Sequence, residues 1–468
     1  MLVACSPRST LPPPTLPLTP SPDAPFRATP PALETTALDP PEVRSAELSN
    51  GMHVLVVERP DLPLVTLAWA SHAARDSGAP HEAGLAALTV HALREGTRFS
   101  DGRELAHVRI NGEPPQIWVG NDGTVIGIHT PAAGLSVGVD TLAATVRRPI
   151  LAPAGVEAGR AEQLEALVLQ STGVGYQLRD AALLGLFGEK HPSVGALGRH
   201  ADVVTYTPDM VSRFHATHYA PESSALLAVG AVTLEQVVLL AERHFGDWVR
   251  SGTPAPPTTP VHPLERSRPI QGLSGAGQRA SVALALPCPP ASDAREADFD
   301  VLGMVLANLP LSRATRQLRH GESMAYPVTA RCEATRGRGT FWVEFAVEPE
   351  RVGDALAMVL GQIGRLRTED VPQAELDLAK IQLLGRVGGE LSTNAGITRM
   401  LANVFLRGEP PEALARWVRD VQGATSARMR ESARLYLTGR IGVATYGRRD
   451  LIEVGLARFG ATEWSMLR

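Results

Sequence analysis

Long hydrophobic runs, cysteines and aromatic residues are all scarce in this chain. Its 468 residues include 3 cysteines, and only 5% of them are aromatic. The apolar runs are too short and too often interrupted to span a bilayer, so the sequence predicts no membrane helix. Three cysteines make neither a disulfide framework nor a C-x-x-C metal pair, and we interpret Cys288 and Cys332, in strand-like runs, as buried apolar residues.

An excess of one charge is absent as well. The formal net charge is −4 and the sequence pI is about 6.4, which gives no electrostatic reason to expect binding to nucleic acid or to an anionic membrane surface. A hydrophobic content of 44% is typical of a globular protein with sizeable cores. The length of the chain favours two or more domains.

The N-terminal segment has its own character. Leu-Val-Ala-Cys at residues 2–5 resembles a bacterial lipobox, in which Cys5 would carry lipid. No basic region and almost no apolar segment precede it, so either the match arises by chance or the signal peptide begins further upstream. Pro, Thr, Ala and Ser dominate as far as Pro41 and predict an extended tether. We expect residues 1–44 to form this signal remnant and tether. A genuine lipobox would anchor the chain to the bacterial cell envelope, in the periplasm or at the outer membrane; otherwise the protein is expected in the cytoplasm.

The rest of the chain divides into two similar halves. Strand, helix and hairpin patterns follow one another in the first half, with the hairpin turn at Asn121-Asp122-Gly123. The second half repeats this order, with a long helix expected at 298–319. A Pro-rich stretch separates the halves. We therefore predict an α+β fold with two homologous domains, 45–250 and 266–468, joined by a linker at 251–265, each an antiparallel-rich sheet packed with helices.

One helix carries the most informative pattern. Residues 84–97 resemble the active-site helix of insulinase/pitrilysin-type zinc peptidases, which reads G-L-A-H-x-x-E-H-x-x-x-x-G-T. Here Ala87 replaces the first His, Val90 replaces the Glu, and only the second His is retained, as His91. In that motif the two His bind zinc and the Glu acts as general base. The methyl groups of Ala87 and Val90 can do neither.

The third zinc ligand of that family is a Glu on a later helix. The corresponding helix here includes residues 160–167, and the alignment places Ala166 at the ligand position, although a slip of one residue would place Glu165 there. One His and one uncertain Glu do not hold a catalytic zinc, which takes three protein ligands and a water. We therefore predict no metal in this chain and interpret His91 as a packed or hydrogen-bonded helix residue.

A second resemblance lies in the other half. Residues 311–326 are similar to the family signature S-R-L-x-x-x-L-R-x-x-x-x-x-x-Y, which implies that Arg319 and Tyr326 contact substrate near the scissile carbonyl. Both side chains can donate hydrogen bonds to a developing oxyanion, where one donor is worth about 3 kcal/mol of barrier. The alternative is an Arg at a helix C-terminus and a packed strand Tyr.

The family resemblance covers nearly all of the chain after residue 45 and implies one of two functions. In the first, the chain is inactive alone and supplies substrate-binding, oxyanion-stabilising groups to a heterodimeric zinc endopeptidase. Its partner would carry the intact H-x-x-E-H motif and the zinc, and unfolded peptide would be the substrate. The alternative is a stand-alone pseudopeptidase that binds peptides or serves as a structural component of the envelope.

Overall fold

The computed structural model describes residues 38–74, 82, 84–106, 109, 113–188, 198–251, 262–266, 268–321 and 325–466, and no side chain at 171, 319–327 or 466. Cys5 and most of the expected tether and linker lie outside these residues. Leu38–Arg468 forms one compact unit. Within the described ranges, no helix combines the length and the apolar character needed to cross a membrane.

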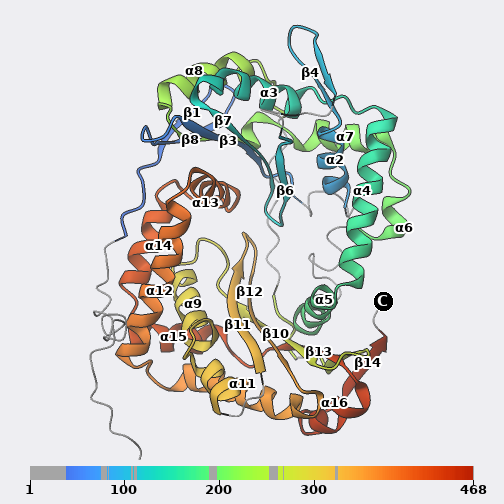
Figure 1. Cartoon of the computed structure of the whole chain (residues 1–468), viewed down its shortest axis with the longest axis vertical. Helices are drawn as coiled ribbons and strands as arrows, with labels where there is room; N and C mark the ends of the chain where they lie inside the picture. The colour runs from blue at the N-terminus through green and yellow to red at the C-terminus, as the bar shows by residue number, and fades with distance from the viewer. Residues whose placement is uncertain are drawn as a thin grey trace, which may run out of the picture. The chain divides into compact units, whose positions relative to one another are not determined.

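The first half contains a six-stranded sheet, sheet 1, in the order β1-β2-β8-β3-β7-β6 (Figure 1). β2 and β8 are parallel, and the other neighbours are antiparallel. The central strands are buried on both faces, which suits their nearly continuous runs of apolar residues. The strands are β1 (Arg44–Glu47), β2 (His53–Glu58), β3 (Leu64–Ser71), β6 (Gln116–Val119), β7 (Thr124–Pro131) and β8 (Ser224–Gly230).

The second half contains sheet 2, in the order β11-β12-β10-β13-β9-β14. β9 is parallel to both of its neighbours, and the remaining pairs are antiparallel. The strands are β9 (Ile270–Ser274), β10 (Ala280–Cys288), β11 (Ala325–Ala334), β12 (Gly339–Val347), β13 (Gly442–Gly447) and β14 (Thr462–Met466). Two antiparallel-rich sheets packed with helices confirm the predicted α+β class.

The two sheets share the arrangement of five strands. In order, β2, β8, β3, β7 and β6 correspond to β9, β13, β10, β12 and β11, and each neighbouring pair has the same relative direction. The sixth strands differ, because β1 is antiparallel to β2 whereas β14 is parallel to β9. This repeated topology is what an internal duplication produces, while the exact domain boundaries stay a prediction.

The helices follow the same repeated order. In the first half they are α2 (Leu85–Leu93), α3 (Leu135–Arg147), α4 (Pro153–Thr172), α5 (Val174–Phe187), α6 (His200–Val203), α7 (Pro208–His218) and α8 (Leu234–Phe245). In the second half they are α9 (Glu296–Gly303), α10 (Arg313–Thr315), α11 (Val352–Thr368), α12 (Gln373–Leu391), α13 (Asn394–Leu406), α14 (Ala413–Gln422), α15 (Ser426–Tyr436) and α16 (Arg449–Leu456).

The single helix expected at 298–319 is wrong in detail. After α9 the chain forms a π-helical segment, η4 (Met304–Asn308), breaks at Leu309, and resumes as α10 and a second π-helical segment, η5 (Arg316–Gly321). Pro310 explains the break, because proline disfavours helical geometry in the residue before it.

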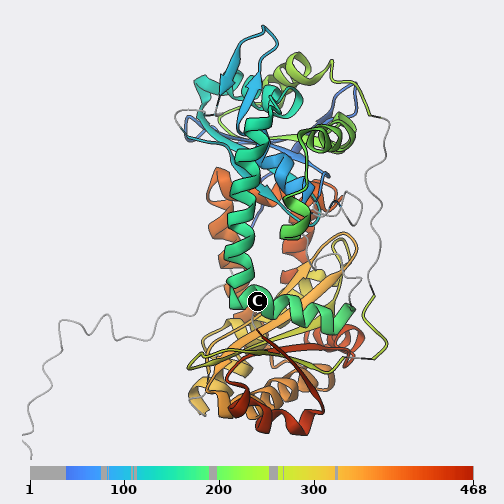
Figure 2. The same cartoon turned by 90° about the vertical axis from the view of Figure 1, so that its right-hand side faces the viewer.

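Each half supplies a helix that covers a sheet of the other half (Figures 1 and 2). One face of sheet 1 packs against α2, α3 and α8, and its opposite face packs against α13 from the second half. Sheet 2 repeats the arrangement, with α5 from the first half on the face that does not meet its own helices. α13 contacts β3 and β8, and α5 contacts their counterparts β10 and β13.

Candidate functional site

Helix α2 keeps the shape of an active-site helix without its reactive groups. It begins after Gly84, whose φ of 93° lies in the left-handed region that favours glycine. Ala87 and Val90 are buried, with 5% and 2% of their surface exposed, so both positions serve the packing of the helix. The N-terminus has no side-chain cap. The Gln163 amide of α4 donates a hydrogen bond of 2.9 Å to the Gly84 carbonyl and so joins α4 to the start of this helix.

His91 belongs to a small polar cluster. Its Nδ1 lies 3.0 Å from the Glu162 carboxylate and 3.0 Å from Nη2 of Arg94, which also donates to Glu162. Burial, together with the charge of Arg94, lowers the pKa of His91 despite the attraction of Glu162. Burial raises the pKa of Glu162, but the hydrogen bonds and charges of Arg94 and His91 together outweigh burial and leave a net lowered pKa. Glu162 is thus an ionised partner already neutralised by an arginine.

Glu162 is the α4 carboxylate that pairs with His91 of the motif helix. Ala166 and Glu165 are both exposed. Gly159 lets the helices approach, because a Cβ there would lie 3.0 Å from the His91 side chain. Positions 159, 162 and 163 share one helical face, a periodicity that could have identified Glu162 from the sequence. In the part of the chain that the structure describes, no cluster of three His, Cys, Asp or Glu could hold a metal ion.

The backbone segment that carries Arg319 and Tyr326 is anchored at both ends. Arg319 lies in η5 and Tyr326 in β11, and the side chains of both lie outside the described residues. Upstream, Arg313 is buried and its Nε donates a hydrogen bond of 2.9 Å to Glu375 of α12. Downstream, β11 pairs with β12 along most of its length. The structure therefore places the two backbones on neighbouring elements and leaves the proposed contacts as a prediction.

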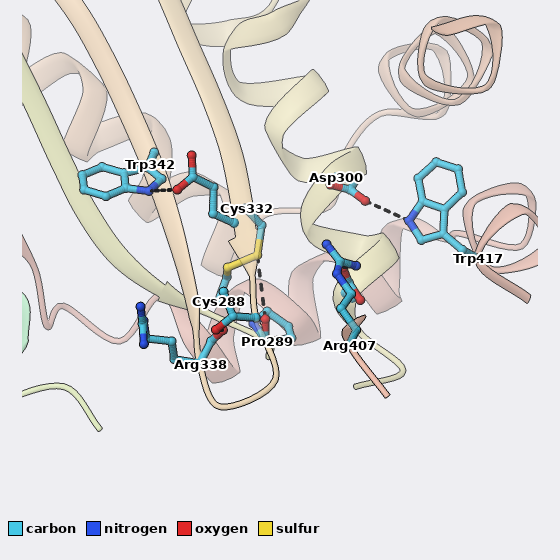
Figure 3. The surroundings of a disulfide bond; sticks show 11 residues. Cys288, Pro289, Asp300, Cys332, Arg338, Trp342, Arg407 and Trp417 are labelled. Atoms are coloured by element: carbon cyan, nitrogen blue, oxygen red, sulfur yellow. Dashed lines mark hydrogen bonds and ion pairs between the residues drawn. A yellow bond between two sulfur atoms is a disulfide. The ribbon is translucent and has the colours of Figure 1, made fainter. Parts of the chain in front are cut away.

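A disulfide joins Cys288 at the end of β10 to Cys332 of β11 (Figure 3). The interpretation of these cysteines as separate buried residues is wrong. β12 lies between the two strands, so their spacing should be near 9.5 Å, yet the Cα atoms are 6.3 Å apart. The strands converge where β12 begins at Gly339, since a Cβ there would lie 2.4 Å from the Cys288 carbonyl oxygen.

A cavity of about 220 Å³ adjoins this disulfide and is lined mainly by α9, α13 and α14. Nε1 of Trp417 donates a hydrogen bond of 2.8 Å to Asp300 (Figure 3). Arg407 pairs with Glu296 at 2.6 Å. Burial raises the pKa of Asp300 to about 7, and the hydrogen bond from Trp417 limits the rise. Burial likewise raises the pKa of Glu296.

Residues 205–383 match the family model described as Peptidase M16 inactive domain. The chain is 24% identical over 344 residues to an uncharacterised zinc protease of Mycobacterium leprae, covering 73% of this chain and 77% of that protein.

Solved structures share the fold. A peptidase M16 inactive domain from Pseudomonas fluorescens superposes with a TM-score of 0.77 at 20% identity, covering 87% of this chain and 98% of that one. A protease from Helicobacter pylori gives 0.78 at 17% identity, with 88% and 100% covered. A chain of Complex III2 from Candida albicans, with Inz-5 bound, gives 0.74 at 14% identity, with 88% and 97% covered.

Proposed function

We propose that this chain, a catalytically incomplete homologue of the insulinase-type (M16) peptidases, is the substrate-binding subunit of a two-chain zinc peptidase. The observation that carries the proposal is helix α2, which keeps its fold and its contacts to α4 while alanine and valine occupy the positions of a ligand and the base. A second family member with the intact H-x-x-E-H motif would hold the zinc and activate the water.

The edge of sheet 1 supports a role in peptide binding. β6 is the last strand of the sheet and contacts α2. An extended peptide can add to such an edge through main-chain hydrogen bonds, which bind unfolded chains with little dependence on sequence. In this arrangement a peptide would lie alongside the helix that carries Ala87, Val90 and His91.

Arg319 and Tyr326 supply the catalytic part of the proposal. Both can donate to a carbonyl oxygen as it gains negative charge, a task that the zinc-bearing partner would otherwise perform with the metal alone. The backbone elements that carry these two residues adjoin a hydrogen-bonded framework, because Arg313 bonds Glu375 before η5 and β11 pairs with β12.

The test is reconstitution of the pair. The full chain is co-expressed with a family member from the same organism that has an intact H-x-x-E-H motif, and cleavage of a quenched unfolded peptide and bound zinc are measured. We expect no zinc and no cleavage with this chain alone, and chelator-sensitive cleavage with the pair. Arg319→Ala and Tyr326→Phe should each lower kcat roughly a hundredfold. Arg316→Ala is the matched control, because Arg316 is an exposed residue of the same helical segment. Full turnover in both test variants would refute the oxyanion role.

A structural role is the second candidate. The similarity in fold to a chain of Complex III2 from Candida albicans shows that this architecture also occurs in a large assembly. If the chain forms a stable complex in which no subunit carries the zinc motif, and Arg319→Ala leaves that complex intact, the structural role replaces the catalytic one.

The disulfide supports a location outside the cytosol. Disulfides form and persist in oxidising compartments such as the bacterial periplasm and are rare in reducing ones. We propose that the chain works in the cell envelope, anchored by lipid at Cys5. Mass spectrometry of the intact native protein should find a lipid on Cys5 and the Cys288–Cys332 bond. Free thiols at all three cysteines would place the protein in the cytoplasm.

A further inference from the structure

A second cavity, of about 230 Å³, lies between sheet 1 and α13. Three strands form its floor, because Gln116 of β6 pairs with Gly127 of β7, which in turn pairs with Ala68 of β3. The pairs of residues on either side of this floor have larger side chains: Thr66 pairs with His129, and Trp118 pairs with Val125. The space between these larger side chains is hollow because Ala68 contributes only a methyl group and Gly127 only a hydrogen.

Gly127 has no structural requirement to be glycine. A Cβ at this position would meet no atom closer than 3.8 Å, and its backbone lies outside the left-handed region. Glycine inside a strand weakens the strand and is found where a ligand or another backbone approaches closely. Ala68 and Gly127 thus keep a space open that an ordinary strand residue would fill.

The cavity opens beside the edge of the sheet. Its lining includes Gln116 and Trp118 of β6, and Trp118 exposes 36% of its surface. Because side chains alternate along a strand, a peptide added to β6 would direct every second side chain to the face of the sheet that α13 covers. One of these side chains would lie next to the row formed by Gln116, Gly127 and Ala68.

The lining selects the chemistry of the occupant. Trp118, Val125 and Ala395 of α13 provide apolar walls, and Thr66 and His129 bond each other at 2.9 Å. Arg399 is a charged residue of the described lining, and its guanidinium is already paired with the Glu390 carboxylate. Because this charge is compensated, a charged side chain would lose its hydration here without gaining a counter-ion, which favours an uncharged occupant. The volume suits one bulky side chain.

We propose that this cavity is a specificity pocket that takes an aromatic or large aliphatic side chain of a peptide added to β6. The inference rests on the proposed function, since it requires a peptide at this edge. It adds a preference for a bulky uncharged residue at one position of the peptide, recognised on the face of sheet 1 that α13 covers.

The test uses acetylated, amidated hexapeptides that alternate threonine with phenylalanine, alanine, lysine or glutamate, titrated calorimetrically into the full chain. The phenylalanine peptide should bind roughly tenfold or more tightly than the alanine peptide, as expected for burial of an aromatic side chain. Gly127→Leu, which fills the cavity from its floor, should abolish that difference while binding of the alanine peptide persists. Gly361→Leu is the control, because Gly361 on α11 also has open space around its Cβ position.

Each outcome decides a different question. Equal binding of the phenylalanine and alanine peptides, or full selectivity in Gly127→Leu, overturns the pocket but leaves peptide addition to β6 intact. Preference for the glutamate peptide would assign the site to anions through Arg399 and also overturn the proposal. If no peptide binds, both the pocket and the use of this edge by the proposed function fail. Circular dichroism establishes that Gly127→Leu is folded; if it is not, Ala395→Trp fills the same cavity from α13.

Discussion

The side chain of Asn308 bonds both backbone polar groups of Ala330: its Nδ2 donates to the carbonyl oxygen, and its Oδ1 accepts from the amide at 3.0 Å. Ala330 belongs to β11, the last strand of sheet 2, and it is buried. Asn308 therefore takes the place of a neighbouring strand and closes part of this edge. α9, which leads directly into the segment that carries Asn308, also approaches β11 closely. A Cβ on Gly303 of α9 would lie 2.7 Å from the Ala330 carbonyl oxygen.

Asn308→Ala should destabilise the protein by about 1–3 kcal/mol, because it leaves a buried amide and a buried carbonyl without partners. It should also promote self-association, since an unpaired strand edge is a template for another chain. Urea unfolding and light scattering measure the two effects. Asn403→Ala, on the exposed side of α13, is the control and should change neither. An Asn308→Ala variant with unchanged unfolding would show that water replaces the side chain without cost.

Gly442→Ala should destabilise the packing of α5 on sheet 2. A Cβ at Gly442 would lie 1.9 Å from the Ala182 carbonyl oxygen, so helix and strand must separate. Overpacking of this kind costs about 1–3 kcal/mol, and more where only backbone can move. Gly175→Ala is the matched control on the same helix, because its Cβ meets nothing within 4 Å. We expect it to be neutral or to stabilise by up to about 1 kcal/mol. Equal midpoints for the two variants in thermal unfolding would contradict this account.

Asp300→Asn should make stability less dependent on pH. The pKa of Asp300 rises to about 7 in the folded protein from an ordinary 3.8, so the folded state favours the protonated acid. The stabilising contribution of the protonated acid is complete below pH 3.8 and is lost as pH rises through 7. The loss amounts to at most about 4 kcal/mol, and solvent access to this partly exposed residue reduces it. The stability of Asp300→Asn relative to the parent should therefore increase between pH 4.5 and pH 8 in urea unfolding. Asp377→Asn, at an exposed position of α12, is the control for the substitution itself. Parallel curves for Asp300→Asn and the parent would refute the shift.

Removal of the disulfide should destabilise the chain strongly. The bond closes a loop with a sequence separation of 44, which contains Arg319 and Tyr326. Loss of such a cross-link costs about 4 kcal/mol through the entropy of the unfolded chain. The double variant Cys288→Ser/Cys332→Ser should unfold at lower urea concentration, and reductant should shift the parent towards it while leaving the variant unchanged. If reductant shifts both equally, the effect does not come from this bond.

The strands of the sheet centres were the most predictable part of the fold. β2, β3 and β8 are short runs of apolar, often β-branched residues bounded by turns, which is the sequence pattern that predicts a strand. β9 contains a glycine, and both β9 and β14 contain polar residues. They owe their conformation to pairing within the sheet, which no local pattern reveals. The break before Pro310 was available in the sequence as a proline signal, but the apolar periodicity on both sides obscured it.

The residues of the candidate site also differ in how far the sequence predicts them. The loss of the metal ligand and of the base can be predicted directly from Ala87 and Val90, because their side chains have no atom that binds a metal or accepts a proton. The contact of Glu162 with His91 depends on how two helices cross, and the spacing of the family motif directed attention to Ala166 instead. The Cys288–Cys332 bond depends on the convergence of strands that flank a third, and 44 residues of separation carry no information about that distance.

Because α5 and α13 each cover the sheet of the other half, the two sheets are covered at different times during synthesis. α5 precedes every strand of sheet 2, so the cover for that sheet is present before its first strand emerges from the ribosome. Sheet 1 has all its strands once Gly230 has been made, yet the helix that covers its second face begins at Asn394. Throughout the interval an apolar sheet face that includes Leu55, Ala70 and Leu227 has no cover of its own. The first half thus needs protection from aggregation for longer than the second, although the finished protein protects both alike.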